Sequence, residues 1–226
     1  MTKDIEALSR CPLFEGVTGE DIASMLGCMQ ARTVSVEKGE AVFREDGPAE
    51  YVGILLEGGV RVLRDDFYGN RTIRAAILPG ELFGETFACA GVRRLPVSVE
   101  ATEPSRVLLL KLERVVGICP GACAFHSRVV LNLLRAMAAK NLVLSQKLEI
   151  TSRRTTRDKL MAYLLAQAKA AGGDRFRIPF DRQGLADYLG VDRSALSAEI
   201  GKLRREGVLE SNRSEFRLIR SEGYNV

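Results

Sequence analysis

Residues 181–207 read DRQGLADYLGVDRSALSAEIGKLRREG, and this stretch decides the architecture of the C-terminal third of the chain. Its apolar spacing predicts two short helices, one ending at Leu189 and the next beginning after Asp192. Gly190 allows a tight turn between them, including a left-handed one, and Val191 can fill the corner. Asp192 is a good N-cap for the second helix. Two short helices joined this closely predict a helix-turn-helix unit.

Each expected helix has an apolar face that can turn inward, formed by Leu185, Ala186 and Leu189 in the first and by Leu196, Ile200 and Leu203 in the second. The first turns of the second helix would enter the major groove of DNA. Arg193 is long enough to reach guanine or a phosphate, whereas Lys202, Arg204 and Arg205 suit phosphates. The hairpin that follows, with strands near 208–210 and 215–219, is interpreted as a wing. The residues we expect at DNA are Gln183, Asp192, Arg193, Ser194, Ser197, Ala198, Lys202, Arg205 and Arg213. An ordinary helical hairpin with a solvated basic face is the alternative.

The charge is unevenly placed along the 226 residues, a length that favours two domains. Residues 151–226 carry 15 Lys and Arg against 10 Asp and Glu, a net charge of +5. Residues 1–150 carry 18 against 19, a net charge of −1. This asymmetry indicates a polyanion-binding module joined to a domain with another task, although a solvated basic surface would show the same charge.

No stretch approaches the roughly 20 apolar residues that a membrane span needs, and the first residues lack the apolar run of a secretory signal. We therefore expect a soluble, cytoplasmic protein without a membrane partner. The cysteines are odd in number, which favours reduced thiols over a disulfide framework. With His126 as the single histidine, no metal site is predicted. The cysteines are Cys11, Cys28, Cys89, Cys119 and Cys123.

The region from 31 to 112 consists of short β-type runs separated by turn signals such as Gly47-Pro48 and Pro79-Gly80. This pattern predicts a β-sandwich or a barrel-like domain. The preceding residues, 4–30, are interpreted as short helices, with Asp4 capping the first and Thr18 opening the second. The runs are 33–36, 40–43, 52–56, 60–63, 71–78, 97–99 and 107–110.

A helical pattern follows residue 121 and continues for almost thirty residues. Its apolar positions step by four and three, which is a heptad seam and favours two helices winding together. Asn141 lies within the seam, where one polar residue can fix the register and the number of partners. A helix packed within its own domain would show the same hydrophobes. The predicted dimer seam is Val130, Leu134, Met137, Asn141, Leu144 and Leu148.

Two separate segments carry a family resemblance. RQGLADYLGVDRSALSAEIGKLRREGVL (182–209) resembles the DNA-reading segment of the Crp/Fnr family of bacterial transcription regulators. PGELFGETFACAG (79–91) with PVSVEATEPSRVLLL (96–110) resembles that family's β-roll effector domain. The resemblance implies an α+β fold: a jelly-roll-like double-stranded β-helix in an effector domain over 1–120, a long dimerisation helix over 121–150, and a winged helix-turn-helix over 151–226. It also implies a homodimer that binds a pseudo-palindromic operator in double-stranded DNA, and RNA polymerase is a possible further partner.

The effector segment departs from the nucleotide-binding branch of the family. That branch holds the cyclic phosphate with an Arg-Ser pair, and this chain has Leu95 and Pro96 at those positions. Neither residue can anchor a phosphate. The remaining candidates for an effector pocket are Gly84, Glu85, Thr86, Cys89, Arg93, Arg94 and Val97. We therefore expect no cyclic nucleotide and leave the effector unidentified.

Two other cofactors of the family fit poorly as well. The resemblance to the iron–sulfur branch fails because Cys11 and Cys28 stand seventeen residues apart. Haem is not expected, because His126 would begin the dimer helix rather than face a pocket. Cys89 in the effector loop is a candidate redox-sensitive thiol, with an inert cysteine as the alternative. The signal is thus expected to be a small molecule or a redox change.

Other function classes explain less of the sequence. A metal-dependent enzyme of the cupin type would draw histidines from its β region, which has none. No catalytic residue is predicted. A sensor or scaffold whose winged helix binds protein rather than DNA stays open as the second alternative.

Overall fold

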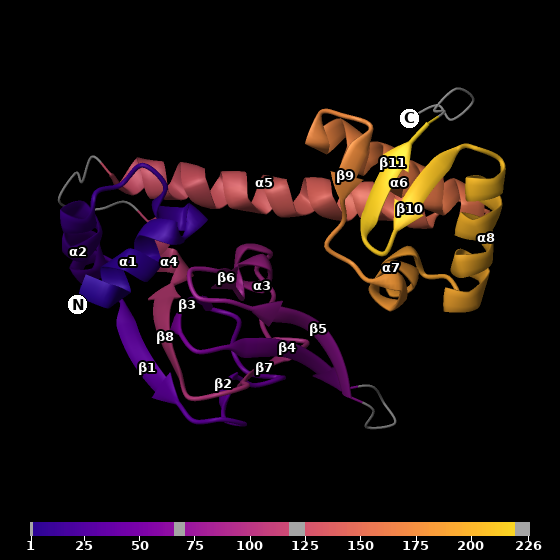
Figure 1. The fold of residues 1–226 in the computed structure, drawn as a ribbon. Coiled ribbons are helices and arrows are strands. Elements are labelled where there is room, and N and C mark those ends of the chain that lie inside the picture. The colour runs from indigo at the N-terminus through magenta and orange to yellow at the C-terminus, as the bar shows by residue number, and fades with distance from the viewer. Residues whose placement is uncertain (1, 66–70, 118–124, 220–226) are drawn as a thin grey trace. The chain divides into compact units, whose positions relative to one another are not determined.

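The computed structural model describes residues 2–65, 71–117 and 125–219, and the chain forms two compact units, residues 1–139 and 140–226. Unit 1 holds two β-sheets and short helices, and unit 2 holds three helices and a small sheet (Figure 1). A long helix, α5 (His126–Thr151), contributes residues to both units. In the described ranges, no helix is both long and apolar enough to cross a membrane.

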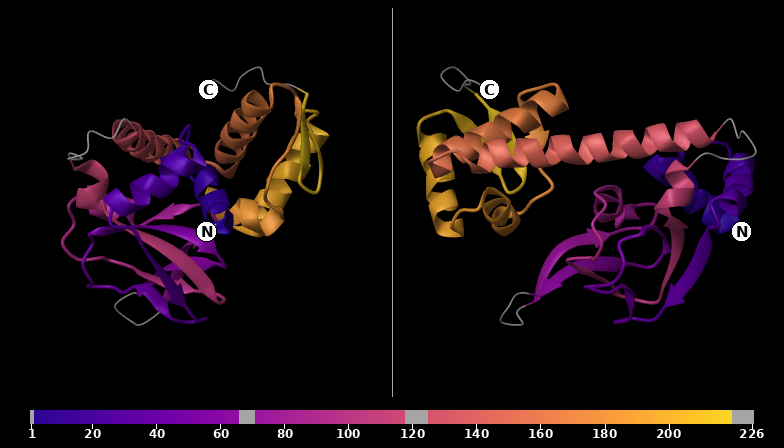
Figure 2. Two further views of the ribbon diagram at one scale, coloured as in Figure 1. Left: turned by 90° about the vertical axis from the view of Figure 1, so that its left-hand side faces the viewer. Right: turned by 180° about the vertical axis from the view of Figure 1, so that it is seen from behind.

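Unit 1 is built on two four-stranded antiparallel sheets, with strand orders β1-β8-β3-β6 and β2-β7-β4-β5. The arrangement agrees with the expected double-stranded β-roll, which Figure 2 shows from two further sides. The strands are β1 (Arg32–Val36), β2 (Ala41–Phe43), β3 (Tyr51–Glu57), β4 (Val60–Asp65), β5 (Arg71–Ile77), β6 (Leu82–Phe83), β7 (Ser98–Ala101) and β8 (Ser105–Lys111).

The two central strands, β3 and β8, show why unit 1 has two cores. Successive side chains of a strand point to opposite faces. Leu55, Val107 and Leu109 therefore join the core between the sheets. Their neighbours Ile54 and Leu110 face the other way and join a second core with the helices. Those helices are α1 (Thr2–Arg10), η1 (Pro12–Phe14), α2 (Gly19–Cys28), α3 (Glu85–Cys89), α4 (Leu112–Val116) and the first turns of α5.

The start of α5 is tied to the N-terminal helices. Val129 and Leu133 are fully buried in the helical core of unit 1. Between them Asn132 is also buried, and its amide donates to the backbone oxygens of Leu13 and Glu15 at 3.1 and 2.8 Å. This side of α5 belongs to its own domain.

The residues of the predicted seam differ in how exposed they are. Met137 is half-buried and packs against the helical core of unit 1, and Val130 is half-buried as well. Met137 therefore contacts its own domain, and the dimer seam stays a prediction at all six positions. The other four, Leu134, Asn141, Leu144 and Leu148, are exposed.

Unit 2 packs α6 (Thr156–Ala171), α7 (Arg182–Leu189) and α8 (Arg193–Arg205) on a sheet of order β10-β11-β9. The strands are β9 (Arg175–Arg177), β10 (Leu209–Asn212) and β11 (Glu215–Leu218). Helix α6 ends at Gly172 with φ +70°, a left-handed conformation that suits glycine at a helix C-terminus. All six apolar residues predicted to face inward from α7 and α8 are buried in the core of this unit.

Two helix caps were predicted near the N-terminus, and one of them is confirmed. Thr18 caps α2 by accepting from the backbone N–H of Asp21, as predicted. Asp4 is not a cap: it lies inside α1, and both of its carboxylate oxygens accept from the Arg106 guanidinium at 2.9 and 3.1 Å. Its distant partner in β8 could not be read from local sequence. Cys119 and Cys123 lie outside the described residues.

Candidate nucleic-acid interface

The turn between α7 and α8 forms as the residues predict. Gly190 has φ +63°, a left-handed conformation that glycine adopts without strain. The backbone N–H of Val191 donates to the Ala186 oxygen at 3.1 Å, which closes the end of α7. Asp192 then caps α8 by accepting from the backbone N–H groups of Ser194 and Ala195 at 2.8 and 3.0 Å. These contacts fix the direction in which α8 leaves the turn.

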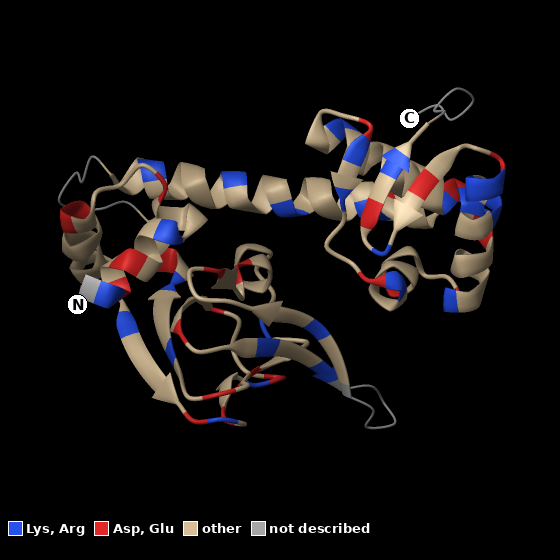
Figure 3. Cartoon of the chain, viewed as in Figure 1, with Lys and Arg blue, Asp and Glu red and all other residues tan. Residues whose placement is uncertain are grey.

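The polar face of α8 is exposed along its length. Arg193, Ser194, Ser197, Ala198, Lys202 and Arg205, all expected at DNA, are exposed. Figure 3 shows basic residues at both ends of this helix. Gln183 of α7 is exposed too, and its amide donates to Asp187 at 2.8 Å. The structure thus brings the predicted α8 residues together on one accessible face.

The Asp192 cap is ionised at neutral pH. The hydroxyl of Ser194 donates to the carboxylate, and this contact lowers the pKa of Asp192 below its ordinary value. The two backbone N–H groups of the first turn lower the pKa further. The positive end of the helix macrodipole favours the same negative charge.

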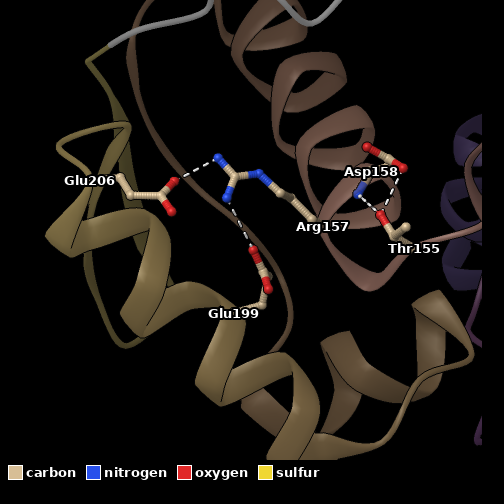
Figure 4. Close-up of polar contacts among 5 residues, drawn as sticks. All are labelled: Thr155, Arg157, Asp158, Glu199 and Glu206. Atoms are coloured by element: carbon tan, nitrogen blue, oxygen red, sulfur yellow. Dashed lines mark hydrogen bonds and ion pairs between the residues drawn. The ribbon is translucent and has the colours of Figure 1, made fainter.

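An ion-pair clamp holds α8 against α6 (Figure 4). The two terminal nitrogens of Arg157 contact Glu199 at 3.4 Å and Glu206 at 2.7 Å. Thr155 caps α6 just before Arg157, accepting from the Asp158 N–H at 3.0 Å. The contact with Arg157 lowers the pKa of Glu206. Sequence reasoning missed this clamp, because its partners lie more than forty residues apart.

The wing adds a second basic element. Arg213 lies at the turn between β10 and β11 with φ +52° and is exposed. It lines an open groove of about 1030 Å³ together with Arg193, Arg177 and Arg182. The Arg182 guanidinium lies 5.8 Å from the centre of the Phe216 ring, and burial, then the charge of Arg204, lowers its pKa. Arg177 and Arg182 were not among the residues predicted to contact DNA, although both lie in the basic segment.

The effector-loop residues are placed in unit 1 around α3. Gly84 has φ +80°, and a Cβ there would stand 2.8 Å from the Phe43 ring, so glycine is required. Glu85 is buried, and the Thr86 hydroxyl donates to it at 3.3 Å. Cys89 is exposed. Partial burial raises the pKa of its thiol, and the charge of Glu85 raises the pKa further, which disfavours the reactive thiolate.

The segment after α3 differs from a phosphate clamp. Arg93 and Arg94 are exposed, whereas Leu95 and Val97 are buried. Leu95 belongs to the core between the sheets, and its backbone exchanges hydrogen bonds with Asp46 and Gly47 at 2.9 Å each. The position expected to hold a phosphate is therefore filled by a core residue.

The single histidine and two further cysteines were considered as cofactor or metal ligands. His126 is half-buried at the start of α5, Cys11 is buried and Cys28 is exposed. Among the described residues, no group of three or more His, Cys, Asp or Glu side chains is placed to hold a metal ion.

A β-roll followed by a winged helix-turn-helix with an exposed basic helix defines a two-domain DNA-binding regulator. Comparison with known proteins agrees: residues 33–120 match the model of the cyclic nucleotide-binding domain, and residues 158–223 match that of the Crp-like helix-turn-helix domain. The chain belongs to the Crp/Fnr family of transcription regulators.

The relatives span most of the chain. The transcriptional activator FnrA of Stutzerimonas stutzeri is 23% identical over 193 residues, which cover 83% of this chain and 77% of FnrA. The cyclic AMP receptor protein of Thermus thermophilus is 26% identical over 198 residues, 88% of each chain. Among solved structures, the c-di-GMP-responsive regulator CLP of Xanthomonas campestris is 16% identical and superposes with a TM-score of 0.55, covering 90% of this chain and all of CLP. That likeness shows the fold.

Proposed function

We propose that this protein works in the bacterial cytoplasm as a homodimer that binds a pseudo-palindromic operator and responds to an effector other than a cyclic nucleotide. The observation that carries the proposal is the combination of one exposed basic recognition helix with an exposed apolar stripe on α5. One recognition helix reads a half-site, and a two-fold dimer presents two of them about 34 Å apart.

The apolar stripe supports self-association. Leu134, Asn141 and Leu148 are spaced by seven residues and are exposed in the single chain. Large aliphatic side chains exposed in regular heptad positions favour a second helix of the same kind. A two-fold interface is self-complementary, so the same stripe serves both protomers. Asn141 in the middle of the stripe would fix the register.

The α8 face supports DNA rather than protein as the ligand. Arg193, Lys202 and Arg205 are exposed on it, and Arg213 stands on the wing. Such cations neutralise phosphates and release counterions, which makes affinity fall steeply with salt. A partner protein of ordinary composition would not give this dependence.

The effector region supports a signal other than cyclic nucleotide. One relative carries cyclic AMP in its name. In this chain Leu95 is buried in the core and offers no charge, while Arg93 and Arg94 are exposed beside it. The first candidate signal is a small apolar molecule. An oxidant acting on the exposed Cys89 is the second candidate, which the raised pKa of that thiol disfavours.

Two measurements test the proposal on the full-length protein. Mobility shift with salt titration should show a linear fall of log affinity with log salt, with a slope of several units. A slope near zero would favour the protein-binding alternative. Calorimetry with cyclic AMP should show no heat of binding, and micromolar affinity would overturn the effector assignment.

A further inference from the structure

The first turn of α8 contains a hydrogen-bond arrangement that restricts what Ser194 can recognise. One carboxylate oxygen of Asp192, Oδ1, accepts three hydrogen bonds, from the N–H groups of Ser194 and Ala195 and from the hydroxyl of Ser194. The serine is held by the same residue that caps its helix. All three residues are exposed at the start of α8, where a recognition helix reaches furthest into the groove.

The direction of the hydroxyl contact follows from the chemistry of the partner. An ionised carboxylate accepts hydrogen bonds and cannot donate one. Asp192 is ionised at neutral pH, because its hydrogen bonds lower its pKa. The hydroxyl proton of Ser194 is therefore directed at Asp192, and the lone pairs on Oγ face outward.

A hydroxyl that can only accept a hydrogen bond distinguishes between bases in the major groove, because only some of them present a donor there. Adenine and cytosine present amino groups there, at N6 and N4, which donate hydrogen bonds. Guanine and thymine present acceptors there but no donor, and thymine adds its C5-methyl group. A serine is ordinarily able to contact either kind of group, since its hydroxyl can rotate.

We infer that Ser194 reads DNA as an obligate acceptor and selects adenine or cytosine at one position of each half-site. The inference rests on the proposed function, because it requires α8 to lie in the major groove. It assigns to Asp192 a positioning role, because the cap holds the hydroxyl proton of Ser194 and leaves that hydroxyl able only to accept from a base.

A second consequence of the cap points the same way. The Ser194 and Ala195 N–H groups, which an anion could otherwise bind at a helix N-terminus, are already occupied by Asp192. The negative carboxylate also repels a phosphate. The first turn is therefore suited to the positive edge of an amino group, and the adjacent Arg193 supplies the donor for a guanine.

Ser197 provides a matched control. It is exposed on the same helix. No hydrogen bond within residues 2–65, 71–117 and 125–219 engages its hydroxyl, so that group is able to donate or accept. A base contact by Ser197 should accordingly show no preference for amino groups.

Selection of duplexes from a random library tests the inference with the full-length protein and three variants. The wild type should show an adenine or cytosine preference of about 3- to 10-fold at one position per half-site, the range expected for one hydrogen bond. Ser194→Ala should abolish that preference and leave the other positions unchanged. Asp192→Ser keeps a capping residue but removes the charge, so the preference should relax to admit guanine or thymine. Ser197→Ala should leave this position intact.

Base analogues then identify the atom. At the selected position, purine in place of adenine, or 2-pyrimidinone in place of cytosine, lacks the amino group. Wild-type affinity should fall by the same 3- to 10-fold, and Ser194→Ala should lose nothing. A guanine or thymine preference that depends on Ser194, or a pattern unchanged in Ser194→Ala, would overturn the inference. Failure of the wild type to enrich any sequence would instead refute the proposed function.

Discussion

Replacing Leu134 and Leu148 together by lysine should convert the proposed dimer to monomers. The two side chains are 62% and 69% exposed in the single chain, so roughly two thirds of each is left for a partner to bury. Complete burial of a leucine contributes about 1.5–3 kcal/mol, which gives about 1–2 kcal/mol for each side chain here. A symmetric dimer contains four of them, so the variant should lose about 4–8 kcal/mol of association free energy. This loss raises the dissociation constant by about 10³- to 10⁶-fold.

Sedimentation equilibrium over a range of protein concentrations measures that change, and operator binding should be lost in parallel. Val143→Lys is the matched control, because Val143 is also 63% exposed but lies nine residues from Leu134, on the opposite side of the helix. The control should remain dimeric. Circular dichroism should show that the β-roll and the winged helix stay folded in the double variant, since both leucines are exposed, with any loss of helical signal confined to the middle of α5. A folded double variant that dissociates no more readily than the wild type would refute the assignment of this stripe.

The nucleic-acid interface yields three more predictions. Arg193→Ala should weaken operator binding by about 1–3 kcal/mol and relax one base position per half-site, whereas Lys202→Ala should weaken operator and random DNA alike. Equal losses on both duplexes for Arg193→Ala, measured by fluorescence anisotropy, would make Arg193 a phosphate contact. Asp192→Ala should lower the melting temperature at neutral pH, and the difference from the wild type should shrink as the pH falls below 3.8. A carboxyl with a lowered folded-state pKa stabilises the fold above its ordinary value of 3.8, and this stability is lost as the pH falls through the folded-state value. Gly190→Ala should destabilise unit 2 by about 1–2 kcal/mol in urea unfolding because of its left-handed backbone, while Gly201→Ala inside α8 should be neutral or stabilising; equal effects would contradict the role of the turn.

The sequence alone predicted the helix-turn-helix well, because the residues that determine it lie close together in the chain. Gly190, Asp192 and the apolar spacing act within a few residues, and the structure places them as expected. The supports of this unit are long-range. The pairing of Arg157 with Glu199 and Glu206, and the stacking of Arg182 on Phe216, join segments far apart in the chain. The periodicity of apolar residues does not predict such long-range contacts.

In the β-roll, alternation of apolar residues located most strands but not the short pieces between them. Strand β6 has two residues and helix α3 has five, too few for a period to appear. The double role of α5 was hidden for another reason. Met137 and Leu134 are both apolar and three residues apart, yet one packs against its own domain and the other is exposed. Hydrophobicity predicts that a residue will be covered and does not say by which chain.

The middle of α5 has a consequence for how order and assembly are linked. Every residue from 138 to 149 is exposed in the single chain, and the division between the two units falls inside this stretch. A helix of about twelve residues in which no side chain is buried is marginal in water. Its backbone amides should therefore exchange readily with deuterium in a dissociated chain and become protected when a second helix covers them. Helix formation in this segment and association of the protomers are then thermodynamically coupled. The protein concentration in the cell therefore sets the extent of both.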